Sequence, residues 1–242
     1  MFKTRAIILR TTKYGETSLV VTAFTELFGV QTYMVNGVRT AKKTGQKASL
    51  YLPASLVDME VYHNEKNTMH RIRECNRAVI YENVLTNIVK NSIAVFMMEL
   101  LNKLLKQPEP NADLFYFCED ALQQLDFAPA NVASNFPLFF ALHLSHFFGF
   151  RIDDNYDENN TYLDLQEGFF VEEIPEHNYY LDAENAAVTA DLLKIGMPQE
   201  LHQIKLNQQK RRFLLHKYMD YYSIHISEFG VMKTLQVLEE VL

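Results

Sequence analysis

Two kinds of hydrophobic pattern divide the chain near residue 80. Before that point, short segments rich in Val, Ile, Thr and Tyr alternate with turn-forming stretches, which is the pattern of β-strands. Five strands are expected, at residues 3–14, 17–25, 30–38, 55–63 and 70–80. Within residues 17–25 both strand faces are largely apolar, which is typical of a strand in a small closed barrel.

After residue 81 the hydrophobic period becomes that of helices. Apolar residues at i, i+3, i+4 and i+7 spacing predict a long helix from Leu85 to Leu105, which ends before Pro108. Asn111 or Asp113 is expected to cap a second helix. A third helix, at residues 136–150, is apolar nearly all round and is expected to be buried. Helices resume at residues 183–195 and from residue 207 to the end, with a pause at Gly230.

The segment from residue 151 to 180 interrupts the helical pattern. It holds nine carboxylates and one arginine, with two short apolar stretches on either side of a Gln-Glu-Gly turn. We expect an acidic β-hairpin inserted between helices. The fold class is therefore α+β, with a five-stranded OB-fold barrel over residues 1–80 and a mainly α-helical domain over residues 81–242 that contains the hairpin.

The overall net charge of -7 conceals an asymmetry between these two parts. Residues 1–80 hold 12 Lys and Arg against 6 Asp and Glu, a net charge of +6, whereas the remaining residues carry -13. Such asymmetry indicates two modules with different partners, and the basic module is suited to a polyanion.

The cations of the first 80 residues are interleaved with tyrosines, including Tyr33, Tyr51 and Tyr62. Cations bind phosphates regardless of sequence, and aromatic faces on a barrel stack bases. The expected DNA contacts are Lys3, Arg5, Arg10, Lys13, Tyr14, Arg39, Lys42, Lys43, Lys47, Arg71 and Arg73. One alternative is a solvated loop with ordinary strand-edge lysines. Another is an adaptor whose barrel binds an acidic protein partner and never touches nucleic acid.

Motifs of common catalytic sites are absent from the sequence, including a Gly-rich phosphate loop, Gly-x-Ser-x-Gly, His-Glu-x-x-His and Cys-x-x-Cys. A single arrangement resembles a metal site, in which His143 and His146 lie one turn apart, followed by Asp153 and Asp154. Because phenylalanines share that helix face, we favour core or surface histidines over a metal-dependent enzyme. No catalytic residue, metal or cofactor is expected.

The compartment is expected to be the cytoplasm. Cys75 and Cys118 are the only cysteines, which is too few for a disulfide framework. The longest apolar runs are too short to span a bilayer, and residues 1–10 lack the features of a signal peptide.

Residues 6–43 resemble the start of RecO, a bacterial family of recombination mediators. The shared features are a strand ending in Leu9 and Arg10, a Tyr-Gly-Glu-x-Ser turn at residues 14–18, a Thr-x-x-x-Gly turn at residues 25–29 and a basic loop from Gly37 to Lys43. The C-terminal stretch is similar to the family's closing pattern, with Arg211 or Arg212, His225 and residues 233–238.

The resemblance implies a protein without covalent chemistry that takes part in DNA repair. It implies binding of single- and double-stranded DNA, annealing of complementary strands, and loading of RecA onto DNA coated by single-strand-binding protein (SSB), with RecR as partner. It also implies that the acidic, aromatic-ended SSB tail docks on the helical domain. The cations expected to receive the tail are Lys205, Lys210, Arg211, Arg212 and Lys217.

The acidic insertion departs from the family pattern. Many RecO proteins carry a four-cysteine zinc site at this place, but residues 151–180 contain no cysteine. We therefore expect a metal-free hairpin, and its net charge of -8 would repel phosphate. The side chains expected to hold it are Tyr162, Leu163, Phe169, Phe170 and Val171.

Overall fold

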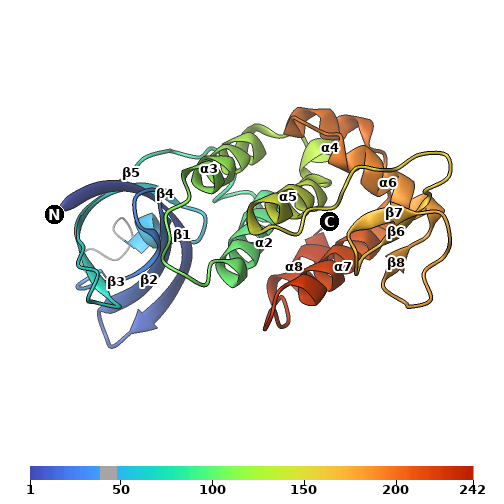
Figure 1. Ribbon diagram of the computed structural model, residues 1–242. Coiled ribbons are helices and arrows are strands. Elements are labelled where there is room, and N and C mark those ends of the chain that lie inside the picture. Colours follow the sequence, from blue (N-terminus) through green and yellow to red (C-terminus); the bar gives the residue numbers. More distant parts are fainter. Residues whose placement is uncertain (39–47, 242) are drawn as a thin grey trace. The chain divides into compact units, whose positions relative to one another are not determined.

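Five strands close into a barrel in the N-terminal part of the chain (Figure 1). The computed structural model describes residues 1–38 and 48–241. The strands are β1 (Phe2–Tyr14), β2 (Ser18–Thr25), β3 (Gly29–Val35), β4 (Leu56–Tyr62) and β5 (His70–Arg77). Their order is β1-β2-β3-β5-β4, and β3 and β5 pair in parallel while the other neighbours are antiparallel. The predicted OB-fold barrel is confirmed.

Alternation of side chains along the strands builds the interior of the barrel. The register of β1 with β2 shifts between Ile8 and Arg10, which leaves Leu9 as a bulge. A bulge bends a strand, and this bend lets the long β1 pair with β2 along one part and with β4 along another. The buried strand residues of this core are Ala6, Ile8, Leu19, Val21, Ala23, Tyr33, Val57, Met59 and Val61.

The compact unit that contains the barrel extends to Asp126 and includes helices α2 (Ile88–Leu104) and α3 (Ala112–Phe127). Asp126 is buried, and its carboxylate accepts hydrogen bonds from the backbone N–H groups of residues 82–84 at 2.7–2.8 Å. These bonds fasten the segment between β5 and α2 to the end of α3. The boundary expected at residue 80 thus lies just after the last barrel strand, whereas the compact unit continues through two more helices.

A second compact unit covers residues 127–242 and is built around α5 (Phe136–Leu144), which is buried on almost every side. It packs against α6 (Ala183–Leu193) and α7 (Gln208–His225). The chain continues from α5 through a short 3-10 turn to Gly149, whose φ of +80° ends it. The short elements of the chain are η1 (Ser49–Tyr51), α4 (Ala130–Ala133), η2 (Ser145–Phe148), η3 (Pro198–Gln203) and α8 (Thr234–Val241). Within the described ranges, no helix combines the length and the apolar character needed to cross a membrane.

The acidic segment folds into a small sheet of order β7-β6-β8. Its strands are β6 (Tyr162–Asp164), β7 (Phe169–Val171) and β8 (Tyr180–Leu181). The predicted hairpin is confirmed, and β8 adds a third strand that the sequence pattern did not indicate. Leu163 and Phe170 are buried, but Phe169 is 38% exposed. The expectation that Phe169 holds the hairpin is wrong, because neighbouring strand residues face opposite sides of the sheet.

Hydrogen bonds to Asp164 organise the turn of this hairpin. Its Oδ1 accepts from the backbone N–H groups of Gln166 at 2.8 Å and Glu167 at 3.2 Å. Its Oδ2 lies 3.2 Å from Nε2 of His177, on the segment that leads to β8. In the described part of the chain, no group of three or more His, Cys, Asp or Glu side chains is placed to hold a metal ion.

Candidate nucleic-acid interface

One side of the barrel wall presents outward side chains that include no carboxylate. The registers of β1, β2, β3 and β5 align these side chains in rows, because residues paired across neighbouring strands share a face. Their chain neighbours, such as Val21 and Tyr33, fill the core and face inward. We call this surface the open face; its members are Arg10, Thr12, Tyr14, Ser18, Val20, Thr22, Thr32, Met34 and Arg71.

Helix α3 covers only the far end of this side of the barrel. The next outward residue of β2 after Thr22 is Phe24, whose ring packs against Phe115 of α3 at a centroid distance of 5.6 Å. The other end is open to solvent, where Arg10 and Arg71 are exposed and Tyr14 is 59% exposed. The open face is therefore a solvent-exposed surface that carries an aromatic ring and two guanidinium groups.

The cations at the open face are not offset by nearby acids. Among the described residues, no carboxylate lies within ion-pair distance of Arg10, Lys13 or Arg71. Lys13 is exposed near the end of β1, but it pairs with the core residue Leu19 and therefore lies on the other side of the strand from Tyr14. Glu16 in the following turn is the acidic residue nearest to it in sequence. An uncompensated positive surface of this kind attracts phosphate.

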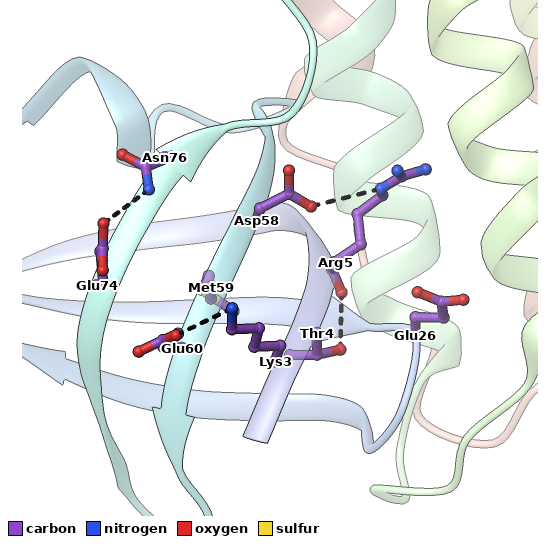
Figure 2. A pocket seen from close by; sticks show the side chains of 9 residues that line it. All are labelled: Lys3, Thr4, Arg5, Glu26, Asp58, Met59, Glu60, Glu74 and Asn76. Atoms are coloured by element: carbon purple, nitrogen blue, oxygen red, sulfur yellow. Dashed lines mark hydrogen bonds and ion pairs between the residues drawn. The ribbon is translucent and has the colours of Figure 1, made fainter. Parts of the chain in front are cut away.

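The other expected cations of β1, Lys3 and Arg5, line a hollow of about 470 Å³ that contains several acids (Figure 2), and Arg73 of β5 pairs with Glu60 of the same hollow. Lys3 Nζ lies 3.5 Å from Glu60 Oε1, and Arg73 Nη1 lies 3.3 Å from Glu60 Oε2. We call this the acidic hollow; its lining residues are Lys3, Thr4, Arg5, Glu26, Asp58, Met59, Glu60, Glu74 and Asn76. With two cations against four carboxylates in its lining, it does not favour phosphate.

Arg5 connects the acidic hollow to α3. Its Nη1 donates to Glu119 Oε1 at 2.7 Å, and its Nε lies 3.7 Å from Asp58 Oδ1. Burial lowers the pKa of Arg5, the carboxylates of Glu119 and Asp58 raise it, and the net result is a raised pKa. Arg5 thus stabilises the attachment of α3 to the barrel, a role that the sequence analysis missed because Glu119 lies 114 residues away.

The tyrosines divide between the core and the surface. Tyr14 and Tyr62 are 59% and 55% exposed, but Tyr33 and Tyr51 are buried, and burial raises the pKa of each buried phenol. The expectation that Tyr33 presents its ring to bases on the barrel surface is therefore wrong, and Tyr51 is only 5% exposed. The alternation of β3 that places Met34 outside also places Tyr33 inside.

The basic loop falls largely outside the described residues. Arg39, Lys42, Lys43 and Lys47 all lie in residues 39–47, which the structure does not describe. The residue before them, Val38, is buried, and its N–H donates to the carbonyl of Thr17 at 3.0 Å. Val38, the last described residue before them, therefore lies beside the turn between β1 and β2.

In the second unit, the expected cations of the SSB-tail site do not all come together. Lys210 Nζ forms an ion pair with Glu184 at 2.8 Å, and Lys217 Nζ lies 3.4 Å from the carbonyl oxygen of Asn178. Neither residue, nor Lys205, is among those that line the small apolar hollow between α5, α7 and α8. We call this the helical hollow; its lining residues are Ser134, Pro137, Leu138, Arg211, Arg212, Leu215, Leu238 and Glu239.

The two histidines of the third helix are packed against aromatic rings. The ring centroid of His143 lies 4.3 Å from that of Phe139 and 5.5 Å from that of His146. Burial and the neighbouring His146 lower the pKa of His143 to about 4, so its imidazole is neutral at pH 7. This is the setting of a core histidine.

Comparison with known proteins places both parts of the chain. Residues 1–80 match the family model of the Recombination protein O N terminal region, and residues 85–234 match that of its C terminal region. DNA repair protein RecO of Azobacteroides pseudotrichonymphae is 30% identical over 241 residues, which is 100% of this chain and 99% of that protein. DNA repair protein RecO of Flavobacterium johnsoniae is also 30% identical, over 99% of this chain and 98% of its own length. The chain therefore belongs to the RecO family of DNA repair proteins.

Proposed function

We propose that this protein is a recombination mediator that acts by binding rather than by covalent chemistry. Its barrel holds single- and double-stranded DNA, and the bound strands are annealed to their complements. The observation that carries the proposal is the open face, where Arg10 and Arg71 lie exposed and no member is a carboxylate. Tyr14 supplies an exposed ring on which an unpaired base can stack.

The two charged surfaces of the barrel have different roles in this proposal. Phosphate is drawn to the open face, while the cations of the acidic hollow are held by Glu60, Asp58 and Glu119. Lys3, Arg5 and Arg73 thus contribute to long-range attraction more than to direct contact. We assign Arg39, Lys42, Lys43 and Lys47, which follow Val38 in the sequence, to the same DNA-binding surface.

Loading of RecA, together with RecR, onto SSB-coated DNA completes the proposed role. The helical hollow is the proposed dock for the SSB tail, because two arginines lie beside an apolar surface of Pro137, Leu138, Leu215 and Leu238; at about 10 Å³, the hollow has to widen to admit a terminal aromatic ring. Arg212 donates to the backbone carbonyl of Glu239, which orients its guanidinium at the edge of the hollow. Arg212→Glu is expected to abolish binding of an acidic peptide with a C-terminal phenylalanine, and Lys205→Glu to leave it nearly unchanged.

The direct test of the proposal measures DNA binding and annealing with the same protein sample. Fluorescence anisotropy of labelled single-stranded DNA over a salt series should show affinity that falls steeply with salt, and complementary strands should pair faster in the presence of the protein. Absence of binding at low salt would overturn the proposal and favour the adaptor whose barrel binds an acidic protein.

A further inference from the structure

The barrel is closed by a very short ladder between β3 and β5. These two strands share only the register pairs Tyr33 with His70 and Met34 with Arg71. From Ile72 onward, the ladders of the described residues pair β5 with β4 alone. Among the described residues, the edge of β5 that faces β3 pairs with no strand beyond Arg71, and η1 contacts β5 there.

A groove of about 440 Å³ lies along this edge, within the range of about 300–1,000 Å³ typical of sites for small ligands. We call it the seam groove; its lining residues are Met34, Val35, Asn36, Gly37, Val38, Leu50, Tyr51, Arg71, Ile72, Arg73, Glu74, Cys75 and Asn76. Several of them are apolar and pack against the barrel core, among them Val35, Leu50 and Ile72. The groove thus has apolar walls that are held in place by the core.

The rim of the seam groove is polar, and Arg71 is its cation without an ion-pair partner among the described residues, because Arg73 pairs with Glu60. Arg71, Asn36 and Asn76 are exposed and offer hydrogen-bond donors, and Glu74 is the one carboxylate of the lining. The register of β4 with β5 shifts between Glu60 and Val61, which makes Arg73 a bulge residue at this rim. Bulges re-aim side chains and are frequent next to functional sites.

The seam groove is continuous with the open face. Met34 and Arg71 belong to both, since they form one register pair of the β3–β5 ladder. A strand whose phosphates contact Arg71 therefore passes the mouth of the groove. A nucleobase has two apolar faces and a polar edge, so it matches apolar walls with donors at the rim.

We infer that the seam groove takes one unstacked nucleobase of single-stranded DNA, an assignment that rests on the proposed binding of DNA by the open face. A duplex keeps its bases stacked and paired, so it presents only phosphates to the same rim. The inference makes the seam groove the element that distinguishes single strands from duplexes. A protein strand paired with the edge of β5 is the competing occupant, and the shared residues Met34 and Arg71, with the exposed guanidinium of Arg71, favour DNA.

Cys75 lies in the groove and provides a built-in probe. It is partly exposed, whereas Cys118 is fully buried, so a thiol reagent reports mainly on Cys75. Burial raises the pKa of Cys75 to about 11, and alkylation is best followed by mass spectrometry at mildly alkaline pH, with Cys75→Ser to confirm the source of the signal. The rate is compared with oligothymidine, with a fully abasic strand of equal length, and with a duplex, each at about ten times its Kd by anisotropy.

Oligothymidine is expected to slow the labelling of Cys75 about tenfold under these conditions. The abasic strand and the duplex are expected to change the rate little, because they have no free base to insert. Equal protection by all three ligands would show that phosphates merely cover the groove, and would overturn the inference. Bound oligothymidine without protection would also overturn it and leave the groove to a protein strand. If no DNA bound at low salt, the proposed function would fail together with the inference.

A groove-filling variant gives an independent readout. Asn36→Trp places a ring at the groove wall, and it is expected to weaken binding of single strands about tenfold while leaving duplex binding unchanged. Asn67→Trp is the matched control, since Asn67 is equally an exposed asparagine but lies in the turn between β4 and β5, outside the lining. Equal affinities of the two variants for single strands would contradict the assignment.

Discussion

The division of the barrel cations into an open face and an acidic hollow predicts that equal losses of charge have unequal effects on DNA binding. Arg10→Ala/Lys13→Ala removes two cations without a carboxylate partner among the described residues, and Lys3→Ala/Arg73→Ala removes two that share Glu60. Both variants lose two charges, so their long-range fields change alike.

The salt dependence of binding separates the two variants. Each phosphate contact to a single strand contributes about 0.7 to the slope of log K against log salt, so the loss of two contacts should lower the slope by about 1.4. Between 50 and 200 mM salt, which is a fourfold range, wild-type affinity should fall about sevenfold more than that of Arg10→Ala/Lys13→Ala. For Lys3→Ala/Arg73→Ala the slope should remain close to that of the wild type.

Fluorescence anisotropy with labelled oligothymidine over this range measures the slopes, and thermal unfolding checks the fold. The four side chains are on the surface, so each substitution should change stability by no more than about 0.5 kcal/mol. Equal slopes for the two variants would refute the reasoning, because the ion pairs of the acidic hollow would then have no bearing on phosphate contact.

Three further predictions concern the packing that supports these surfaces. Asp126→Asn replaces one carboxylate oxygen that accepts from backbone N–H groups by an NH₂ donor. It should lower the free energy of unfolding by about 2–4 kcal/mol in urea titrations. An unchanged free energy of unfolding would show that the carboxylate is solvated. Gly29 has a φ of +64°, and a Cβ there would lie 2.2 Å from the carbonyl oxygen of Glu109; Gly29→Ala should therefore lower Tm far more than Gly15→Ala, whose φ is also positive but whose surroundings are open. The folded-state pKa of His143, about 4, lies below the value of 6.5 for a free histidine. Between these two pH values the unfolded chain binds more protons than the folded chain. The free energy of unfolding should therefore fall by about 1.4 kcal/mol per pH unit as the pH drops through that window. His143→Gln should make this decline shallower below pH 6.5 and leave it unaltered above, and an identical pH profile would show that His143 is solvated.

How far the site was predictable depends on the range of the interaction concerned. Arg10 and Tyr14 lie four residues apart on one strand, so their exposure on a shared face can be read from alternation and charge, whereas Lys13 points to the other side of the strand. The neutralisation of Lys3 and Arg73 requires that Glu60 of β4 lie between β1 and β5, and only the strand order places it there. The burial of Tyr33 and Tyr51 likewise depends on which face of β3 and of η1 is turned toward the barrel interior.

The sequence by itself determined the elements of this protein and its family. Period-two and period-3.6 patterns indicated the five barrel strands, the buried helix α5 and the acidic hairpin, because each pattern reflects which side chains of a local segment avoid water. Tertiary structure alone decided which charges meet. Contacts such as Arg5 with Glu119, or the short ladder that leaves the seam groove beside β5, join residues far apart in the chain, and their geometry arises only when the barrel closes. Local patterns contain no information on such distances, and for that reason the open face and the acidic hollow could not be distinguished by counting cations.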